Sequence, residues 1–235
     1  MSDMIMEISR ESLKSLVARQ LGNIFMFDEK AEGEILSGGI DLALKKCGHC
    51  FSHSRNKYYS KNGEPFFSPW HSAQNCIFLY YLSRAVFETS PADRTLADRI
   101  YYLNRTLNGA DLFYEVKLPD IFFTDHPLGS IMGRAEYSDF FSFAQNCTVG
   151  SNNYLFPKFG KNVRMMSGAK VLGKCNVGEN VIFAANTYVK DTDIPSCSIV
   201  FGSYPDIAIK TRDETYFMHF GEKKSDKDSL KNGVR

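Results

Sequence analysis

The apolar residues of this chain follow two different periods along its length. In the first part, up to about residue 108, they recur every three or four positions, as on one face of an amphipathic helix. This spacing predicts helices over residues 9–25, 29–47, 71–88 and 90–107. The segment between the second and third of these, 52–69, is rich in turn residues and predicts a long loop.

Local signals refine these helices. Ser9 is a good N-cap for the first helix, and Ser90 opens the last one, with a proline in its first turn. The adjacent Gly38 and Gly39 predict a turn that interrupts the second helix. Segment 71–88 is apolar on nearly all sides, so we expect it to be buried.

After residue 108 the period of the apolar positions changes to six. The residues at the repeating position are Phe159, Met165, Val171, Val177, Phe183 and Val189. Four positions later stand mostly small residues: Val163, Ala169, Cys175, Val181 and Thr187. An earlier register has the same step, through Ile131, Tyr137, Phe143 and Val149, with Ala135, Phe141 and Cys147 at the offset position. A period of six fits neither a helix nor an alternating strand.

A six-residue repeat is typical of a parallel β-helix, in which each coil has three short flat faces and every sixth residue points inward. We therefore expect Phe159, Met165, Val171 and Val177 to stack in one inward column. A sandwich of short strands is the alternative, and it would show a period of two within each strand.

An open β-helix has unpaired strands at its two ends and flat apolar faces, and both need to be covered. The helical part can cap one end, and the faces predict a homotrimer around a three-fold axis, or a dimer of two such trimers. The chain is accordingly assigned to the α+β class. Its expected domains are a helical domain over 1–108, a β-helix of hexapeptide repeats over 109–212 and a polar tail over 213–235.

Composition narrows the classes of function. The chain has 28 Lys and Arg against 27 Asp and Glu, so its net charge of +1 gives no concentrated positive face for nucleic acid. No run approaches the roughly 20 apolar residues that cross a bilayer. The N-terminus is charged too early for a signal peptide, and the cysteines are irregularly spaced. These features predict a cytoplasmic protein with reduced thiols.

The stretch CGHCFSH, residues 47–53, is similar to a metal-binding motif. Cys47, Cys50 and His53 have the spacing of metal ligands. A zinc ion needs a fourth ligand, for which His49 is too constrained, and the chain has no second CxxC. We therefore expect a loop with buried thiols and no bound metal.

Several motifs along the chain resemble one known family, the bacterial serine acetyltransferases of the hexapeptide-repeat acyltransferase class. The similar stretches are WHSAQ (70–74), DLFYEVKLPDIFFTDHPLGSIMG (111–133), QNCTVGS (145–151) and SGAKVLGKCNVGENVIFAANTYV (167–189). The resemblance extends from about His71 to Lys210. It implies a left-handed β-helix and acetyl-CoA as co-substrate.

The resemblance also assigns roles to individual residues. His126, in the stretch TDHPLG, matches the catalytic histidine, and Asp111 matches the aspartate that pairs with it. Asp125 matches a residue that holds the acceptor. The residues expected to line the pantetheine arm of acetyl-CoA are Gly150, Ser167, Gly168, Ala169, Ala185 and Asn186, with Lys190 and Lys210 as partners for its phosphates.

These residue types fit acetyl transfer on chemical grounds as well. An acceptor hydroxyl must lose a proton as it attacks the thioester, and an imidazole, with an unperturbed pKa of about 6.5, suits that task. A carboxylate behind an imidazole fixes its tautomer and stabilises the imidazolium. Taken alone, His126 is better explained as a polar corner residue, and Asp111 fits a turn equally well. Together with the repeat they favour catalysis.

One motif departs from the family pattern. In YLFPKFG, residues 154–160, Leu155 and Phe156 stand where the family has an Arg-His pair that binds the amino-acid acceptor. Lys158 remains as a point charge, and an apolar, aromatic wall suits stacking on a sugar ring. We therefore expect O-acetylation of a small molecule or glycan, such as a sugar of a surface polysaccharide, with Phe156 and Lys158 at the acceptor. The alternatives are serine O-acetylation, N-acetylation of a sugar amine, and a catalytically silent scaffold.

Overall fold

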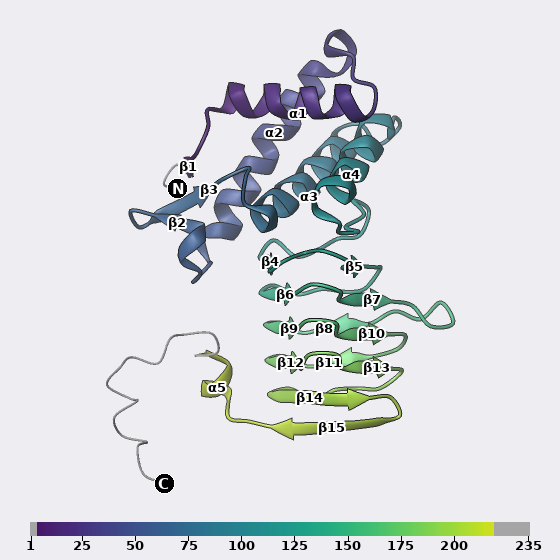
Figure 1. The fold of residues 1–235 in the computed structure, drawn as a ribbon. Helices are drawn as coiled ribbons and strands as arrows, with labels where there is room; N and C mark the ends of the chain where they lie inside the picture. Colours follow the sequence, from purple (N-terminus) through teal and green to yellow (C-terminus); the bar gives the residue numbers. More distant parts are fainter. Residues whose placement is uncertain (1–3, 219–235) are drawn as a thin grey trace.

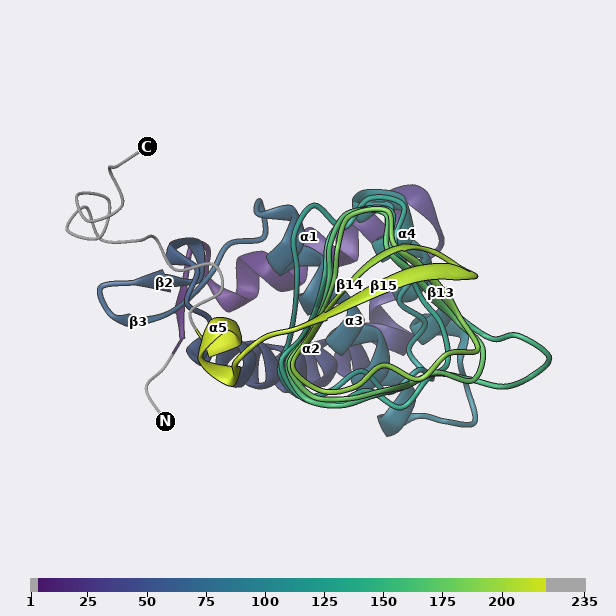
Figure 2. The same cartoon turned by 90° about the horizontal axis from the view of Figure 1, so that it is seen from below.

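The computed structural model describes residues 4–218 and places a layer of helices on one end of a β-helix. The coils stack below the helices in Figure 1, and seen along the stack in Figure 2 they trace a triangular outline. Helices followed by a parallel β-helix are the architecture that the two periods predict. Within the described range, no helix is both long enough and apolar enough to cross a membrane.

The helical layer is formed by α1 (Arg10–Ile24), α2 (Glu29–Ser52), α3 (Ser72–Thr89) and α4 (Thr95–Asn108). The expected cap of α1 is confirmed, because the Ser9 hydroxyl accepts a hydrogen bond from the Ser12 N–H at 3.1 Å. The expected start of α4 at Ser90 is wrong. Ser90 instead closes α3, and the proline after it disfavours a helical backbone at Ser90.

The second helix runs without interruption through Gly38 and Gly39, so the predicted turn is wrong. Gly39 faces α3, because a Cβ built on it would lie 2.8 Å from Cγ2 of Val86 and 3.1 Å from Cδ1 of Leu82. Close packing of two helices therefore explains this glycine. As expected, α3 is buried along most of its length.

The α2 helix also continues through the CGHCFSH stretch, which is therefore not the expected loop. Cys47 and Cys50 lie one turn apart on the buried side of α2, and burial raises the pKa of the Cys50 thiol to about 12. His53 caps the end of the helix at the surface. Among residues 4–218, no group of three or more His, Cys, Asp or Glu side chains is arranged to hold a metal ion.

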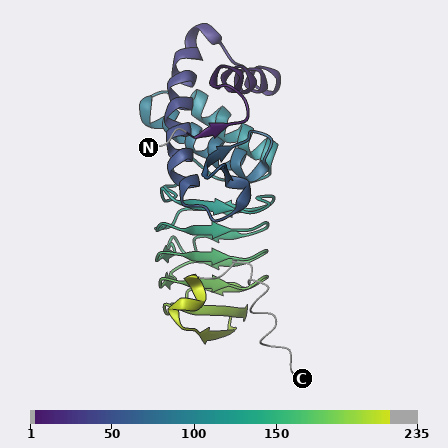
Figure 3. The ribbon, with the colours of Figure 1, turned by 90° about the vertical axis from the view of Figure 1, so that its left-hand side faces the viewer.

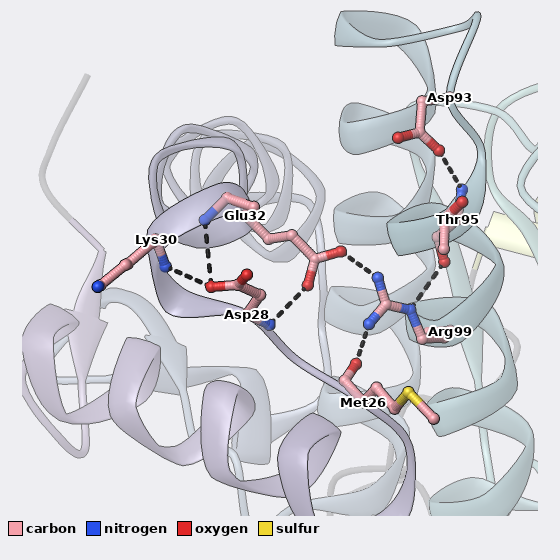
Figure 4. Close-up of polar contacts among 8 residues, drawn as sticks. Met26, Asp28, Lys30, Glu32, Asp93, Thr95 and Arg99 are labelled. Carbon is pink, nitrogen blue, oxygen red and sulfur yellow. Dashed lines mark hydrogen bonds and ion pairs between the residues drawn. The ribbon is translucent and has the colours of Figure 1, made fainter.

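A polar network holds the connection between α1 and α2 against α4 (Figure 4). The Arg99 guanidinium pairs with the Glu32 carboxylate and donates to the carbonyl oxygen of Met26. Glu32 also accepts a hydrogen bond, at 3.0 Å, from the N–H of Asp28, which is the N-cap of α2. One ionic group on α4 thus fixes both the turn and the helix that follows it.

The segment 52–69 is not the long loop that its composition predicts. It forms a 3-10 turn, η1 (Lys57–Tyr59), and the strands β2 (Ser60–Lys61) and β3 (Glu64–Phe67), and β3 pairs in parallel with β1 (Ile5–Met6). The turn residues Asn62 and Gly63 have positive φ angles of 56° and 84°. Asn-Gly at such a turn is a strong hairpin signal that the sequence prediction overlooked.

The β-helix begins after Gly109, the left-handed C-cap of α4. Its parallel strands are β4 (Phe122–Thr124), β5 (Ile131–Met132), β6 (Phe141–Phe143), β7 (Thr148–Gly150), β8 (Lys158–Phe159), β9 (Val163–Met165), β10 (Lys170–Leu172), β11 (Asn176–Val177), β12 (Val181–Phe183), β13 (Tyr188–Lys190) and β14 (Ser198–Ser203). We call the stack of β4, β6, β9, β12 and β14 face A. Face B stacks β5, β7, β10 and β13, and face C stacks β8 and β11.

Inward residues of the β-helix stack on residues one coil away. In the regular part, Val171 pairs with Val189 and Phe159 with Val177, in each case 18 positions later. The repeat residues are buried as expected, but the single column is wrong. Phe159, Met165 and Val171 point inward from faces C, A and B, because three hexapeptides complete one coil and residues six apart fall on successive faces.

Several coils depart from 18 residues. Phe122 pairs with Phe141, 19 positions later, and Phe183 pairs with Val200, 17 positions later. Met132 pairs with Val149, 17 positions later, so Met132 is the buried residue and the expected Ile131 is 46% exposed. Val149 pairs with Val171, 22 positions later. The extra residues form the loop 151–157, which protrudes between β7 and β8 in Figure 1.

The last coil turns back on itself. Strand β15 (Asp206–Thr211) runs antiparallel to β14. The short helix α5 (Glu214–Met218) follows, and Figure 3 shows it lying over the lower coils. Its Phe217 packs against Ile182 and Ile199 on the outside of face A. The expected polar tail, 213–235, thus begins with a helix, and its residues 219–235 lie outside the described range.

Candidate active site

His126 lies at the corner between faces A and B in the first coil. The N–H of Asp125 holds this corner to the next coil by donating to the carbonyl oxygen of Phe143 at 3.0 Å. His126 is exposed and has a φ of 51°, in the left-handed region. Asn146 and Asn186 also have positive φ in later coils, but their counterpart in the first coil is Gly129, with a φ of 73°. The corner of His126, residues 125–130, is longer than the later corners, so the left-handed conformation of His126 is specific to the first coil.

The N-terminus of α3 reaches this corner from the helical layer. His71 is the N-cap of α3, and its Nδ1 accepts a hydrogen bond from the Gln74 N–H at 3.4 Å. Burial lowers the pKa of His71, while the charge of Asp125 raises it and that of His126 lowers it further. His71 is therefore close enough to both residues to respond to their charges, and it is neutral at pH 7.

Tyr59 stands beside the same residues. Its ring centroid lies 5.8 Å from that of His71 and 5.7 Å from that of Phe123. Phe123 is two positions before Asp125 in the sequence. Burial raises the pKa of the Tyr59 phenol, and the charge of Asp125 raises it further. A neutral phenol and a neutral imidazole thus adjoin the Asp125 carboxylate.

Two buried side-chain oxygens lack a hydrogen-bond partner. They are the Tyr59 hydroxyl and Oγ1 of Thr124, and no other buried side-chain nitrogen or oxygen in residues 4–218 is in this condition. An unpartnered buried hydroxyl costs about 1–3 kcal/mol, and native proteins contain few of them. The sequence prediction missed Tyr59 and gave His71 no role, although the WHSAQ motif was an available signal for the histidine.

Asp111 makes no hydrogen bond or ion pair with His126 within the described residues. Its Oδ1 accepts a hydrogen bond from the Tyr101 hydroxyl at 2.6 Å, and its Oδ2 lies 3.8 Å from Nε of Arg105. Burial, followed by this bond, raises the pKa of Tyr101 to about 12, so the phenol stays protonated. Asp111 pairs with Ile131, five residues beyond His126 along the coil. The structure therefore joins Asp111 to α4 and not to the imidazole.

Five of the residues expected to line acetyl-CoA share one corner. Ser167, Gly168 and Ala169 lie between β9 and β10, and Ala185 and Asn186 lie between β12 and β13. The Asn186 N–H donates to the Ser167 carbonyl oxygen at 2.8 Å. A Cβ built on Gly168, whose φ is 74°, would collide with Oδ1 of Asn186. Glycine is therefore favoured at position 168, where these two coils stack.

This corner is continuous with the corner of His126. The Asn146 N–H donates to the carbonyl oxygen of Leu128 at 2.9 Å, and the Gly168 N–H donates to that of Gln145 at 2.9 Å. We call the whole column, from His126 to Asn186, the A–B edge. A thin ligand lying along this edge would extend from the small residues to the imidazole.

The other residues expected to bind CoA lie elsewhere. Gly150 ends β7 at the corner between faces B and C. Lys190 ends β13 at the same corner, and its Nζ lies 5.7 Å from the centroid of the Tyr204 ring. Lys210 lies on β15 opposite Ile199 of face A. Within one chain, Gly150 and Lys190 are therefore separated from the A–B edge.

The loop 151–157 carries the expected acceptor residues at the corner between faces B and C. Phe156 is 40% exposed, and Lys158 pairs with Glu136 at 2.6 Å. These residues line a hollow of about 440 Å³. Its wall also includes Arg134, Tyr154, Leu155 and Lys174. Phe156 and Lys158 thus lie together, but at a different corner of the prism from His126.

The chain is similar in sequence to serine acetyltransferases. No family model matches the chain. A serine acetyltransferase of Synechococcus elongatus is 33% identical over 105 residues, which are 42% of this chain and 43% of that protein. One of Staphylococcus aureus is 31% identical over 122 residues, 45% of this chain and 52% of that protein. The chain thus spans about half the length of the curated relatives it matches.

Solved structures of serine acetyltransferases share the fold at lower identity. One in complex with CoA has a TM-score of 0.67 at 19% identity, over 86% of this chain and 84% of that chain. The structure from Neisseria gonorrhoeae has a TM-score of 0.64 at 19% identity, over 97% and 86%. These likenesses confirm the helical layer and the parallel β-helix. Together with the relatives, they confirm the resemblance that the motifs indicated.

Proposed function

We propose that this chain is an acetyl-CoA-dependent O-acetyltransferase with His126 as its general base. The observation that carries the proposal is the A–B edge, where small residues of later coils stack in line with His126. A pantetheine arm can lie along such an edge only where side chains are small, and it would deliver the thioester to the imidazole. The serine acetyltransferases among the relatives, and the CoA complex of one such enzyme, support this proposal.

In the proposed reaction, the His126 imidazole takes the proton of the acceptor hydroxyl as the hydroxyl oxygen attacks the carbonyl carbon of the thioester. The tetrahedral intermediate then collapses and its carbon–sulfur bond breaks. The thiolate of CoA takes the proton back from the imidazolium, so the products are an acetyl ester and CoA. Asp125 contacts the acceptor, and Asp111, which is held by Tyr101 and Arg105 of α4, supports the base electrostatically.

The proposed acceptor is the hydroxyl of serine or of a similar small molecule. The named relatives support this alternative better than the sugar acceptor that YLFPKFG suggested. Arg134 and Lys174 line the same hollow as Phe156 and supply positive charge that a carboxylate needs. A sugar unit is the second candidate, because the exposed rings of Tyr154 and Phe156 give that hollow an apolar wall.

A complete site needs two copies of the chain in this proposal. His126 and Phe156 lie at different corners of one prism, so they can meet only across an interface between prisms. We therefore propose a homotrimer, or a dimer of trimers, in which the loop 151–157 of one copy faces the A–B edge of the next. A groove between two prisms can bury a long, thin ligand such as acetyl-CoA. Sedimentation of a monomer at micromolar concentration would contradict this assembly.

Release of the CoA thiol from acetyl-CoA tests the proposed function. We would measure it with L-serine, glucose and glucosamine, for the wild type, for His126→Ala and for His53→Ala, a matched exposed histidine. Serine-dependent release that only His126→Ala abolishes is the expected result. Release with glucose would identify a sugar hydroxyl as the acceptor, and release with glucosamine alone would indicate N-acetylation. Binding of acetyl-CoA without release to any acceptor would indicate a silent scaffold.

A further inference from the structure

The Asp125 carboxylate lies among neutral polar groups that the proposed reaction does not use. It makes no hydrogen bond or ion pair of its own within residues 4–218. The Tyr59 hydroxyl, on the side of the helical layer, is buried without a partner, and so is Oγ1 of Thr124, which points into the coil. His71, whose ring adjoins that of Tyr59, is the remaining neighbour from the helical layer. The Tyr59 ring thus joins His71 to Phe123 on the side of the coil where the exposed Asp125 carboxylate lies.

The two ring nitrogens of His71 have different surroundings. Its Nδ1 accepts the hydrogen bond of the Gln74 N–H, so the proton of the neutral ring resides on Nε2. This Nε2–H has no partner within the described residues and is free to donate. The cap of α3 thus sets the tautomer that offers a donor next to a carboxylate.

A neutral His71 suits the proposed reaction because its neighbour His126 becomes positively charged. His126 turns into an imidazolium when it takes the proton of the acceptor, and a second positive charge nearby would oppose that step. Burial favours the neutral form of His71, as described above. A neutral donor can hold the Asp125 carboxylate in place without removing its charge, whereas a lysine or arginine would neutralise it.

We propose that His71 is a positioning residue, which donates from Nε2–H to Asp125 and keeps this carboxylate in one orientation beside His126. The proposal rests on the acetyl transfer proposed above. The Tyr59 hydroxyl is the second donor available to the same carboxylate. His71 would then serve two elements at once, because one nitrogen starts α3 and the other orders the acceptor site.

Two substitutions separate these tasks. His71→Asn keeps an acceptor near the place of Nδ1 and is a favoured N-cap, but it removes the donor at Nε2. His71→Gln carries an amide donor near the place of Nε2 but is a poor cap. His53→Asn, at the exposed end of α2, is the matched control.

With L-serine as acceptor, we expect His71→Asn to melt at the wild-type temperature and to lose about tenfold in kcat, with an unchanged KM for acetyl-CoA. His71→Gln should recover most of kcat in spite of a lower melting temperature. The acid limb of the pH profile should change from a two-proton to a one-proton slope in His71→Asn. Wild-type kcat and slope in His71→Asn, with a stability loss in His71→Gln, would reduce His71 to a helix cap and overturn the proposal.

An NMR titration of the His71 ring tests whether His71 and Asp125 are neighbours even if the wild type transfers no acetyl group to any acceptor. The groups that face His71 are Tyr58 and Tyr59 from η1, and Asp125 and His126 from the corner. We expect Asp125→Asn to lower the pKa of His71 and His126→Asn to raise it. A pKa that responds to neither change would overturn the inference, whereas a response in an inactive protein would leave only the proposed function refuted.

Discussion

The two corners of the β-helix that carry the candidate chemistry are built in different ways. At the A–B edge, backbone hydrogen bonds link each corner to the next, and Asn146 and Asn186 repeat the same left-handed conformation. At the corner between faces B and C, the loop 151–157 interrupts the stack with exposed apolar side chains. Repetition creates a straight edge for an extended co-substrate, whereas the interruption gives a single coil its own shape. We infer that the first corner serves acetyl-CoA and that the second selects the acceptor.

Removal of the His126 imidazole at the A–B edge should have the largest effect on turnover. His126→Ala is expected to lower kcat by about 100-fold or more, because a general base contributes roughly 10²–10⁴ to the rate. Affinity for acetyl-CoA should be unchanged, since the imidazole acts mainly in the transition state. Steady-state kinetics and calorimetric titration with CoA measure the two quantities. A variant with wild-type turnover would make TDHPLG a structural corner only.

A pair of glycine substitutions compares the rigidity of the two corners. Gly168→Ala should lower the free energy of unfolding by about 1–2 kcal/mol, because alanine is strained at its φ of 74° and meets Asn186. Gly150→Ala should change it by less than about 0.5 kcal/mol. Gly150 has no positive φ, and its Cβ would lie 3.2 Å from Cδ2 of Leu172, at a flexible side-chain end. Urea denaturation without ligand measures both, and equal losses would contradict the difference between the corners.

The role of Asp111 in catalysis can be separated from its contacts with α4. Asp111→Asn is expected to lower kcat by about tenfold, less than His126→Ala, because the imidazole stays and loses only a supporting charge. Tyr101→Phe is the control, since it removes the hydroxyl bound to Asp111 and keeps the carboxylate. Turnover that falls equally in both variants would assign Asp111 to the packing of α4 instead.

Substitutions in the loop 151–157 test whether the corner between faces B and C selects the acceptor. Phe156→His alone should raise kcat/KM for serine by less than about twofold, because the carboxylate still lacks a bidentate cation partner. Adding Leu155→Arg supplies that partner and should raise it by about fivefold. Kinetics with serine and glucose for both variants test this. No gain from the double variant would show that the positive charge of Arg134 and Lys174 already suffices.

The smallest expected effect is the pH dependence of stability at the first corner. Because burial lowers the pKa of His71 below about 6.5, its value in an unfolded chain, the folded state binds fewer protons there. The free energy of unfolding should therefore fall as the pH drops through about 6.5. Urea denaturation at neutral and mildly acidic pH should show a smaller fall for His71→Asn. An identical fall in both proteins would contradict this origin.

The sequence predicted the β-helix well because its period follows directly from the geometry of a coil. It could not predict which residues share a face, since a step of six does not show how many steps complete a coil, and coils of 17, 19 or 22 residues depart from three exact hexapeptides. Met132 therefore replaced Ile131 as the buried residue, and the loop 151–157 separates the two registers of the repeat. In the helical layer, Gly39 looks like a turn signal in sequence and is in fact a packing contact with α3.

The sequence likewise predicted some residues of the candidate site and missed others. It located Asp125 and His126, because a corner motif is local. It did not find His71 or Tyr59, since their significance depends on which segments fold over that corner and on which hydroxyls find partners. The separation of Phe156 from His126 within one chain likewise follows from the coil in three dimensions, and no linear spacing reveals it.

The antiparallel course of β15 determines how copies of this chain can meet. A parallel β-helix whose last strand is open offers a template to which another prism could add, and repeated addition would build a fibre. Here the outermost strand runs in the opposite direction and carries Asp206 and Lys210, so a second prism cannot continue the parallel stack. The helical layer covers the opposite end. With the parallel stack ended on both sides, the proposed trimer would form through the sides of the prism.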